Sequence, residues 1–278
     1  MLGKLYLVAT PIGNLEDITI RAINILKEVD LIAAEDTRHT LKLLNHYEIS
    51  KPLISYHRHN EDVKSDILIR KLLTGQNIAI VTDAGTPGIS DPGEEIVKEA
   101  IKNEIDVIPI PGACALINAL IASGLNTKEF AFYGFLPLNK KNRNSIFERL
   151  KKEDKTIILY EAPHKLVKTL EDILESVGDV SCVLAKELTK IHEEFIRGSI
   201  SAIIKKLNEK DCIKGEYIIL LELIHNNSDS ENKIMDKSIE EQYEIYKRQG
   251  MTKKDIIKQI AKNKNVHKNE IYKIFVND

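Results

Sequence analysis

The stretch IAIVTDAGTPGISDPG, from Ile78 to Gly93, decides the fold of this chain. Its first four residues, Ile78–Val81, are apolar or small and predict a short buried strand. The segment Thr82–Gly88 is too rich in Gly and Pro to continue as strand or helix, so it predicts a loop at the carboxyl end of that strand. The pair Ser90–Asp91 then offers a helix N-cap, and Pro92 suits the first helical position. A strand, a loop and a helix in this order are typical of an α/β domain.

The glycines of this loop indicate a ligand at the end of the strand. In open α/β sheets, ligands bind just outside the carboxyl ends of the strands, and Gly85 and Gly88 would let a ligand lie directly on the backbone. The loop matches neither G-x-x-x-x-G-K-[ST] nor G-x-G-x-x-G, so it does not indicate a nucleoside triphosphate or a dinucleotide. Taken alone, the Gly-Thr-Pro-Gly sequence is more often a tight connection with only a structural role than a binding site.

Two further segments repeat the pattern of an apolar strand that leads into a loop with Pro and Gly. They are LYLVATPIGNLED, over Leu5–Asp17, and VIPIPGACA, over Val107–Ala115. We expect each loop to open a helix, with Asp17 or Thr19 capping the first and the small residues 112–115 starting the second. Three strand ends with the same loop chemistry predict one shared cleft.

Composition sets the broad class of the protein. The 278 residues are enough for two domains, and the hydrophobic content of 43% is typical of a packed soluble protein. No apolar run is long enough to span a bilayer, and the start MLGKLYLVAT lacks the features of a secretory signal, so we expect a cytoplasmic protein without a membrane partner. The three cysteines, Cys114, Cys182 and Cys212, have no C-x-x-C spacing, so neither a disulfide framework nor a zinc site is expected.

The order of the expected elements indicates two α/β domains. Over residues 1–112, short apolar strands alternate with helices, which predicts a parallel sheet covered on both faces. A helix over 112–126 is expected to close this domain, with Gly124 as its stop. Over residues 113–225, longer apolar strands with interspersed helices predict a second α/β domain of mixed strand direction. A cleft between two such domains is a common place for a small-molecule site.

The remainder of the chain differs in composition. The polar stretch 226–236 is expected to be a linker. Over 237–278, apolar residues return at helical spacing, which predicts a small helical, helix-turn-helix-like unit, with Thr252 as a helix N-cap. The residues expected to form its core are Ile256, Ile257, Ile260, Ile271 and Ile274.

The charge of this C-terminal unit bears on its partner. The net charge of the chain is −2, which does not favour a nucleic-acid partner, because phosphate contacts need clustered Lys and Arg. The unit nevertheless has a local excess of basic residues, namely Lys247, Arg248, Lys253, Lys254, Lys258, Lys262, Lys264, Lys268 and Lys273, against Glu244, Asp255, Glu270 and Asp278. Two interpretations are open: the unit binds nucleic acid, or its lysines form a solvated helix face and the unit packs on the body or on a partner subunit.

Polar residues at predicted strand ends are candidates for chemistry. Glu35 and Asp36 follow the strand 31–34, so both carboxylates fall at the edge of the cleft, although Asp36 suits the N-cap of the next helix. The group His57, His59 and Glu61 invites a metal assignment, but loop histidines without further ligands at fixed spacing are usually not ligands. We therefore expect no metal.

Further candidates lie in the second domain. Glu161 ends a predicted strand next to Pro163, which fits a first helical position, so Glu161 is either a cap or a ligand contact. Lys186 and Glu187 lie in a hairpin-like stretch, where surface ion pairs explain most charges. The pair Gly215–Glu216 precedes the last strand and could approach the polar edge of a ligand.

Nine motifs in series resemble those of a known family. They are VATPIGNLEDIT, AAEDTRHT, SYHRHNE, VTDAGTPGISDPG, PGACA, YGFLP, YEAPHK, AKELTKIHEE and KGEY. In this order and at these spacings, they resemble the ribosomal RNA small subunit methyltransferase I family, which belongs to the tetrapyrrole methylase superfamily. Each motif alone is weakly specific, whereas nine in series, spread over essentially the whole chain, are highly specific.

The resemblance implies a fold, a cofactor and a reaction. The fold is two α/β domains of the tetrapyrrole methylase type, with the cofactor cleft between them and a small helical unit after them. The cofactor is S-adenosylmethionine. The reaction is methylation of the ribose 2′-hydroxyl of a cytidine in the decoding region of 16S ribosomal RNA, in the small ribosomal subunit. The resemblance also implies a homodimer.

The same resemblance assigns the cofactor contacts residue by residue. The glycine-aspartate-proline loop of the superfamily falls on Gly85–Pro87, where Thr86 replaces the aspartate. The P-G-x-S-A element falls on Pro111–Ala115, where Cys114 stands in the place of the serine, so the hydroxyl contact of that serine is in question. The cofactor-binding residues expected in this way are Thr10, Pro11, Gly13, Ala84, Gly85, Thr86, Ile89, Ser90, Cys114, Ala115, Tyr160, Glu161, Gly215 and Glu216.

Methyl transfer to a ribose hydroxyl needs alignment of the reacting atoms and a group that takes the proton. The candidates for that general base, without a ranking, are Glu35, Asp36, His57, Glu161, Lys186 and Glu187. Two other functions stay open. A small-molecule methylase of the tetrapyrrole type would share the fold and cofactor but would not need the basic helical unit. A non-catalytic ribosome-binding or assembly factor would need that unit and would not bind the cofactor.

Overall fold

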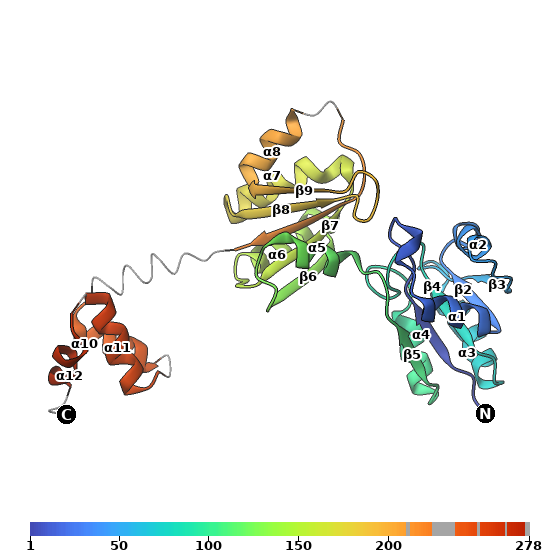
Figure 1. Cartoon of the computed structure of the whole chain (residues 1–278), viewed down its shortest axis with the longest axis horizontal. Helices are drawn as coiled ribbons and strands as arrows, with labels where there is room; N and C mark the ends of the chain where they lie inside the picture. Colours follow the sequence, from blue (N-terminus) through green and yellow to red (C-terminus); the bar gives the residue numbers. More distant parts are fainter. Residues whose placement is uncertain (210–211, 224–236, 249–250, 265, 276–278) are drawn as a thin grey trace. The chain divides into compact units, whose positions relative to one another are not determined.

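The structure is a computed structural model, and it describes residues 1–209, 212–223, 237–248, 251–264 and 266–275. The chain forms two compact units, Met1–Leu223 and Ile224–Asp278. The first unit contains two five-stranded sheets, and the described part of the second is helical (Figure 1). The linker that the sequence predicts over 226–236 lies outside the described residues.

The first sheet is parallel throughout, as the alternation of strands and helices predicts, with the strand order β3-β2-β4-β1-β5. Its strands are β1 Leu5–Val8, β2 Leu31–Ala34, β3 Leu53–Ser55, β4 Ile78–Val81 and β5 Val107–Ile110. The helices that cover it are α1 Ile20–Glu28, α2 Thr37–His46, α3 Glu61–Leu73 and α4 Glu94–Lys102. Because β4 and β1 are central, the loops that follow them are neighbours at one edge of the sheet.

Alternate residues of each strand face two different layers of helices. On β4, Ile78 and Ile80 pack in one core cluster with residues of α3 and α4, whereas Ala79 and Val81 pack in another with residues of α1 and α2. All four are buried. A strand with helices on both faces has no polar face, so its sequence is a continuous apolar run, which is the pattern that predicts it.

The second sheet has mixed strand direction, as predicted, in the order β6-β7-β10-β8-β9. Only β6 and β7 pair in parallel, and the other three pairs are antiparallel. The strands are β6 Phe130–Phe135, β7 Thr156–Glu161, β8 Ser181–Lys186, β9 Glu194–Ser199 and β10 Tyr217–Glu222, and the helices after β6 are α6 Lys140–Leu150, α7 Leu166–Val177 and α8 Ile200–Asn208. Residues of these three helices share one core cluster with the sheet.

The helix α5, Ala115–Ser123, differs from its prediction in what it covers. The sequence predicts that it closes the first domain. In the structure, its Leu116, Ala119 and Leu120 pack with strand residues of the second sheet, on the face opposite α6 to α8. The predicted stop at Gly124 is confirmed, because Gly124 ends α5 in the left-handed conformation with φ 84°. The prediction failed because an apolar helix does not reveal which of two sheets its residues contact.

The C-terminal unit consists of α10 Ile239–Arg248, α11 Lys253–Lys264 and α12 Lys268–Ile274. Four of its five predicted core residues are buried, but Ile274 is exposed, and Tyr246 and Ala261 complete the cluster. A polar contact ties the unit together, since Asn263 Nδ2 donates to Gln242 Oε1 at 3.0 Å and to Tyr246 Oη at 2.8 Å. The predicted cap is confirmed, since Thr252 Oγ1 accepts a hydrogen bond from the N–H of Asp255.

Candidate active site

Hydrogen bonds join the loops after β1, β4 and β5 into one structure. Thr10 and Gly85 exchange two backbone hydrogen bonds, of 2.9 and 3.0 Å between N and O, which link the loops after β1 and β4. The hydroxyl of Thr86 donates to the carbonyl of Ala113 at 3.0 Å, which links the loops after β4 and β5. The shared cleft that the three Pro- and Gly-containing loops predict is therefore fixed by direct bonds between them.

The glycine of the central loop has a backbone conformation that favours glycine. Gly85 has φ 84°, in the left-handed region where a side chain is disfavoured. A Cβ built there would lie 3.4 Å from Ile12 Cγ2, so a larger side chain would enter the space between this loop and the loop after β1. The glycine thus keeps the wall of the cleft free of side chains.

The predicted start of α4 is wrong, and the error concerns the site. The N-cap of α4 is Gly93, and neither Ser90 nor Asp91 caps the helix. A turn intervenes instead, closed by a hydrogen bond from Gly88 N to Pro92 O at 3.1 Å, and Glu61 Oε1 accepts from Gly93 N at 3.0 Å. Asp91 therefore does not cap α4 and instead lines a cavity.

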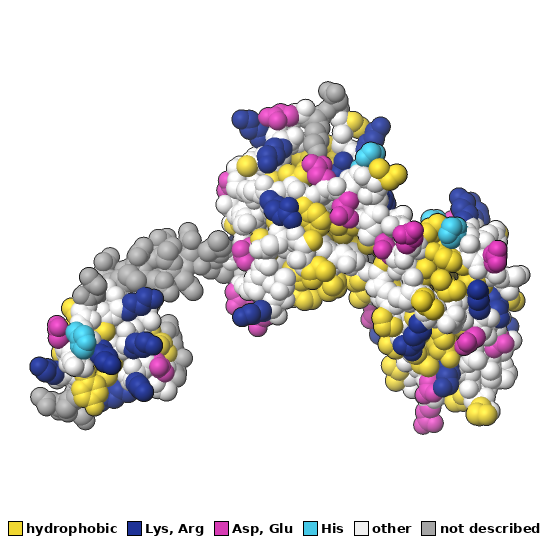
Figure 2. Space-filling view, in the orientation of Figure 1, with side chains coloured by type: hydrophobic (Ala, Val, Ile, Leu, Met, Phe, Trp, Pro, Cys, Tyr) yellow, Lys and Arg dark blue, Asp and Glu magenta, His cyan; other side chains and the backbone are white. Residues whose placement is uncertain are grey.

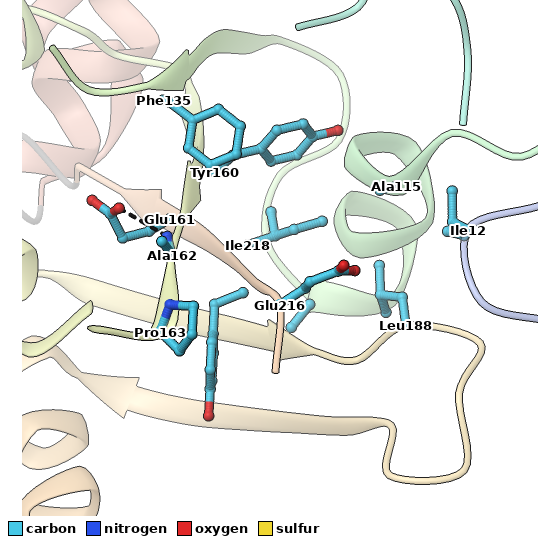
Figure 3. Close-up of a pocket in the computed structure, with 12 residues that line it drawn as sticks. Ile12, Ala115, Phe135, Tyr160, Glu161, Ala162, Pro163, Leu188, Glu216 and Ile218 are labelled. Atoms are coloured by element: carbon cyan, nitrogen blue, oxygen red, sulfur yellow. Dashed lines mark hydrogen bonds between the residues drawn. The ribbon is translucent and has the colours of Figure 1, made fainter. Parts of the chain in front are cut away.

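A first cavity of about 310 Å³ lies where these loops meet the second sheet (Figure 3). Most of its walls are apolar, as in other small-molecule sites. Figure 3 shows the rings of Phe135 and Tyr160 side by side at one wall, and their centroids are 5.6 Å apart. Burial raises the pKa of the Tyr160 hydroxyl, so this group stays protonated and can donate a hydrogen bond. The other lining residues are Ile12, Ala115, Glu161, Ala162, Pro163, Ala185, Leu188, Glu216, Tyr217 and Ile218.

A second cavity of about 300 Å³ shares a wall with the first. The residues common to both are Ile12, Ala115, Phe135, Tyr160 and Glu216. The second cavity is more polar, because the carboxylates of Glu35, Asp83 and Asp91 line it. Its remaining walls are the loop residues Ala84, Gly85, Thr86, Ile89 and Ser90, together with Cys114.

The carboxylates of the second cavity are unequal. Glu35 and Asp83 are held by backbone groups, since Glu35 Oε2 accepts from Asp83 N at 3.4 Å and Asp83 Oδ1 accepts from Asp36 N at 3.0 Å. The pKa of Asp91 is raised to about 6, mainly by burial and also by the charges of Glu35 and Asp83, whereas Arg58 lowers it. Burial also raises the pKa of Glu35. The cavity thus holds a pair of acids that ionise less readily than usual.

Of the six predicted base candidates, Glu35 is the one that lines the second cavity. Asp36 caps α2, and its hydrogen bonds to Arg38, one of them between Asp36 Oδ2 and Arg38 Nη2 at 2.7 Å, lower the pKa of its carboxyl well below the usual range. His57 lies after β3, where its Nε2 is 3.1 Å from Asn60 Nδ2. Neither Asp36 nor His57 lines either cavity.

The candidates from the second sheet have other partners. Glu161 lines the first cavity, but its carboxylate accepts from Thr169 Oγ1 at 2.6 Å and from Ala162 N at 2.8 Å, and Figure 3 shows it turned back toward Ala162. Lys186 Nζ lies 4.0 Å from a carboxylate oxygen of Glu194. Glu187 accepts from Lys190 Nζ at 3.0 Å. Burial alone would raise the pKa of Glu187, but this contact and the N–H of Glu216 lower it.

Ten of the fourteen predicted cofactor contacts line one or both cavities. Thr10, Pro11, Gly13 and Gly215 do not. Gly13 instead contacts the turn after β8, because a Cβ on it would lie 2.8 Å from Thr189 Oγ1. Lining residues that were not among the predicted site residues are Ile12, Asp83, Asp91, Phe135, Ala162, Pro163, Ala185, Leu188, Tyr217 and Ile218. The aspartates stand within the central loop segment, so their place after β4 was a signal that could have found them.

Comparison with known proteins gives the class first. The sequence profile of the family described as "Tetrapyrrole (Corrin/Porphyrin) Methylases" matches residues 4–204. The solved structure described as "Crystal structure of Uroporphyrin-III C-methyl transferase from Thermus thermophilus complexed with S-adenyl homocysteine" shares the fold, with a TM-score of 0.55 and 18% identity over 80% of this chain and 99% of that chain. The fold is that of the tetrapyrrole methylases.

Two curated relatives carry the name "Ribosomal RNA small subunit methyltransferase I". The one from Bacillus subtilis is 50% identical over 273 residues, which are 98% of this chain and 93% of the relative. The one from Thermotoga maritima is 47% identical over 220 residues, which are 79% of this chain and 98% of the relative. The chain belongs to the ribosomal RNA small subunit methyltransferase I family, within the tetrapyrrole methylases.

Proposed function

We propose that this chain is an S-adenosylmethionine-dependent methyltransferase that methylates the ribose 2′-hydroxyl of a cytidine in the decoding region of 16S ribosomal RNA. The observation that carries the chemistry is the double cavity at the hydrogen-bonded ends of β1, β4 and β5. The choice of ribosomal RNA is supported by the relatives' shared name at 50% identity over 98% of the chain.

The residues present fit this cofactor. The apolar first cavity, with the rings of Phe135 and Tyr160, suits an adenine base. The second cavity presents Glu35, Asp83 and Asp91, which favour the cationic sulfonium and amino groups. At Gly85, a Cβ would fill part of the space beside Ile12, so the loop offers bare backbone for close approach. Bound here, the cofactor supplies a methyl group on a positively charged sulfur.

The protein's first contribution to the reaction is alignment. Transfer of a methyl group is an in-line displacement, and holding two reactants in position is worth about 7 to 11 kcal/mol in effective molarity. The bonds of Thr10 with Gly85 and of Thr86 with Ala113 fix the loops that would hold the reactants. The apolar walls would exclude water, which would otherwise compete for the reacting groups.

The second contribution is removal of the hydroxyl proton, which we assign to the carboxylates of Glu35 and Asp91. Both line the second cavity, and both have a raised pKa. A general base works best when its pKa approaches the operating pH, and such catalysis is worth about 10² to 10⁴ in rate. Glu35→Gln and Asp91→Asn should each lower kcat measured at saturating cofactor, and Glu187→Gln should leave kcat unchanged. Wild-type kcat in both variants would remove this assignment.

We also propose that the protein acts as a homodimer. Large apolar side chains are exposed on α5, on β6 and just after β6, and a dimer would bury them: Ile117, Ile121, Phe130, Phe135 and Leu138. Light scattering after size exclusion should give twice the mass of the chain, 31.5 kDa. The change Ile121→Lys should give the monomer mass, and a monomeric wild type would contradict the proposal.

The place of action follows from the substrate. No helix among the described residues is long and apolar enough to cross a membrane. The described residues also contain no group of three or more His, Cys, Asp or Glu side chains arranged to hold a metal ion. Because the proposed substrate is ribosomal RNA, we place the reaction in the cytoplasm.

The test is methyl transfer from radiolabelled S-adenosylmethionine to small ribosomal subunits from cells that lack this chain, followed by mass mapping of the modified nucleotide. Label on a cytidine ribose of the decoding region is the expected result. Cofactor binding without label on subunits or naked RNA would contradict the substrate and favour a small-molecule methylase. Absence of cofactor binding would contradict both enzymes and favour a ribosome-binding factor.

A further inference from the structure

The C-terminal unit is separate from the body that carries the cleft. The relative from Thermotoga maritima is matched over 98% of its length by 220 residues, which leaves about a fifth of this chain without a counterpart in it. The unit that begins at Ile224 makes up about a fifth of the chain. The cleft residues all lie before it. The unit therefore has a role that can be separated from the chemistry of the cleft.

The body is poorly charged for RNA. Residues 1–223 contain 29 Lys and Arg against 33 Asp and Glu, so this part of the chain is net negative. The second cavity adds a local acidic lining, with Glu35, Asp83 and Asp91. Because RNA binding depends on neutralised phosphates, a more basic part of the chain would add to the attraction for RNA.

The helices α11 and α12 have the opposite charge. Their described residues include seven lysines against Asp255 and Glu270. Figure 2 shows Lys and Arg side chains gathered on the visible face of this unit. The lysines Lys254, Lys258 and Lys268 are exposed and form no ion pair with any described residue, so their charges are available to a partner.

A groove of about 950 Å³ runs between these two helices, and these three lysines line it. Lys254 and Lys258, four residues apart, share one face of α11, and Lys268 stands at the start of α12. Tyr272 also lines the groove, and its side chain is 56% exposed, so its ring is open to stacking. The carboxylate of Asp255 also lines the groove. It accepts a hydrogen bond from Thr252, with 2.6 Å between Thr252 Oγ1 and Asp255 Oδ2. The remaining lining residues are Lys253, Ile257 and Asn269.

The groove is held open by the core beneath it. Ile257 lines its floor and is buried with Ile256 and Ile260 in the core of the unit. At the end of the groove, Lys253 Nζ donates to the carbonyl of Phe275 at 2.9 Å, which ties α11 to the end of α12. The lysines are therefore not needed to fill the core, and substitution of their charge leaves the fold in place.

We propose that the groove between α11 and α12 binds the phosphate backbone of RNA through Lys254, Lys258 and Lys268, with Tyr272 stacking on an unpaired base. This surface rests on the proposed function, because RNA is its partner there, and it deepens that function by giving the enzyme a second contact with RNA outside the cleft. Positively charged side chains beside an exposed aromatic ring are the combination that single-stranded RNA requires.

The test uses the full chain with Lys254, Lys258 and Lys268 all changed to Gln. Its matched control, Lys237, Lys247 and Arg248 changed to Gln, removes the same charge from the same unit beside α10. Fluorescence anisotropy measures the affinity for a labelled single-stranded RNA over a series of salt concentrations. The groove variant should lose on the order of tenfold or more in affinity, and the slope of log K against log salt should fall by about two to three. The control should change both by much less.

A second change separates stacking from charge. Tyr272→Ala should lower the affinity for single-stranded RNA by about fivefold or more and leave the affinity for an RNA duplex unchanged. Unaltered melting temperatures will show that both variants are folded. Equal losses in groove variant and control, or no loss in either, would overturn the proposal, and so would lost binding to assembled subunits with wild-type binding to naked RNA, since that indicates a protein partner.

The RNA-binding test of the groove does not depend on the methylation reaction. RNA binding is measured without S-adenosylmethionine, so a chain that fails to methylate ribosomal RNA but shows the expected loss in the groove variant would contradict the proposed substrate and leave the groove intact. A chain that methylates the decoding region while its groove variant binds RNA as wild type would support the proposed substrate and contradict the groove.

Discussion

The cleft of the first unit and the groove of the second are formed by different kinds of groups. The cleft is made of backbone and of partly buried side chains, and hydrogen bonds such as the one from Thr86 to Ala113 connect its loops. The groove is made of exposed side chains on two helices, with Lys254, Lys258 and Tyr272 open to solvent. The second cavity of the cleft is also acidic, whereas the groove is basic.

This difference separates geometry from attraction. A site that holds reactants for displacement needs atoms fixed to within a fraction of an ångström, which bonded loops and buried groups can provide. A site that attracts a polyanion needs charge in solvent, and long flexible lysines serve it well, since their position matters little. Changes in the cleft should therefore act on cofactor binding and rate, and changes in the groove on RNA affinity and its salt dependence.

The largest effect should come from filling the cleft. Gly85→Arg puts a side chain where a Cβ already lies 3.4 Å from Ile12 Cγ2, so we expect cofactor binding to be lost in calorimetry. The control is Gly124→Arg, because Gly124 has the same φ of 84° but nothing within 4 Å of a built Cβ. Equal losses in both variants would assign the effect to backbone strain, and cofactor affinity retained in Gly85→Arg would count against the cleft.

Removal of the C-terminal unit should have the next largest effect, and this effect concerns the groove instead of the cleft. A chain that lacks residues 231–278 should bind small subunits and RNA more weakly than the three-lysine variant, because it loses the whole groove. Its affinity for the cofactor should match that of the full chain, since the cleft lies within the first unit. Filter binding and calorimetry measure the two quantities, and subunit binding equal to that of the full chain would contradict this division of roles.

A smaller effect is expected from a single bond between cleft loops. Thr86→Val removes the hydroxyl that donates to Ala113 O, which should lower the free energy of unfolding by about 0.5 to 1.5 kcal/mol. Thr86→Ser keeps the hydroxyl and should recover most of that loss. Urea denaturation followed by circular dichroism measures both. A Thr86→Ser variant as unstable as Thr86→Val would show that the methyl group, and not the bond, stabilises the loop.

The smallest effect concerns the pKa of Asp91, which burial raises to about 6 from a usual 3.8. Between these two values, the folded state binds more protons than the unfolded state, so the ionised carboxylate makes the protein less stable as the pH rises through this window. Asp91→Asn should therefore raise the melting temperature at pH 7.5 and have little effect near pH 4. The control is Asp66→Asn on α3, whose side chain is exposed, and it should change the melting temperature at pH 7.5 much less than Asp91→Asn. A gain for Asp91→Asn that is equal at both pH values would contradict the assignment.

Local pattern sufficed for most of the fold. The run Ile78–Val81 is apolar because β4 is covered on both faces. Its sequence alone therefore predicts that the strand is buried. The helix caps Thr19 and Thr252 are also local, since each hydroxyl accepts from a backbone N–H three residues on. Helix α5 is the exception, because its apolar face fits either sheet and only the tertiary structure decides between them.

The site was less predictable because its contacts are distant in sequence. The sequence predicts Ser90–Asp91 as a cap, but Glu61 supplies the carboxylate at the start of α4 and Asp91 lines the second cavity. Glu161 is a candidate base by position alone, and its bond to Thr169 becomes evident only in the structure. The raised pKa of Asp91 likewise depends on Glu35 and Asp83, which the folded sheet brings near it.

The self-contained core of the C-terminal unit, in which Asn263 links Gln242 to Tyr246, has a consequence for the evolution of the family. A unit with a core of its own can be gained, lost or altered as a whole without a matching change in the body, and the match to the relative from Thermotoga maritima leaves about a fifth of this chain without a counterpart. With the proposed RNA groove on this unit, the affinity for RNA can change in evolution while the residues of the cleft stay the same.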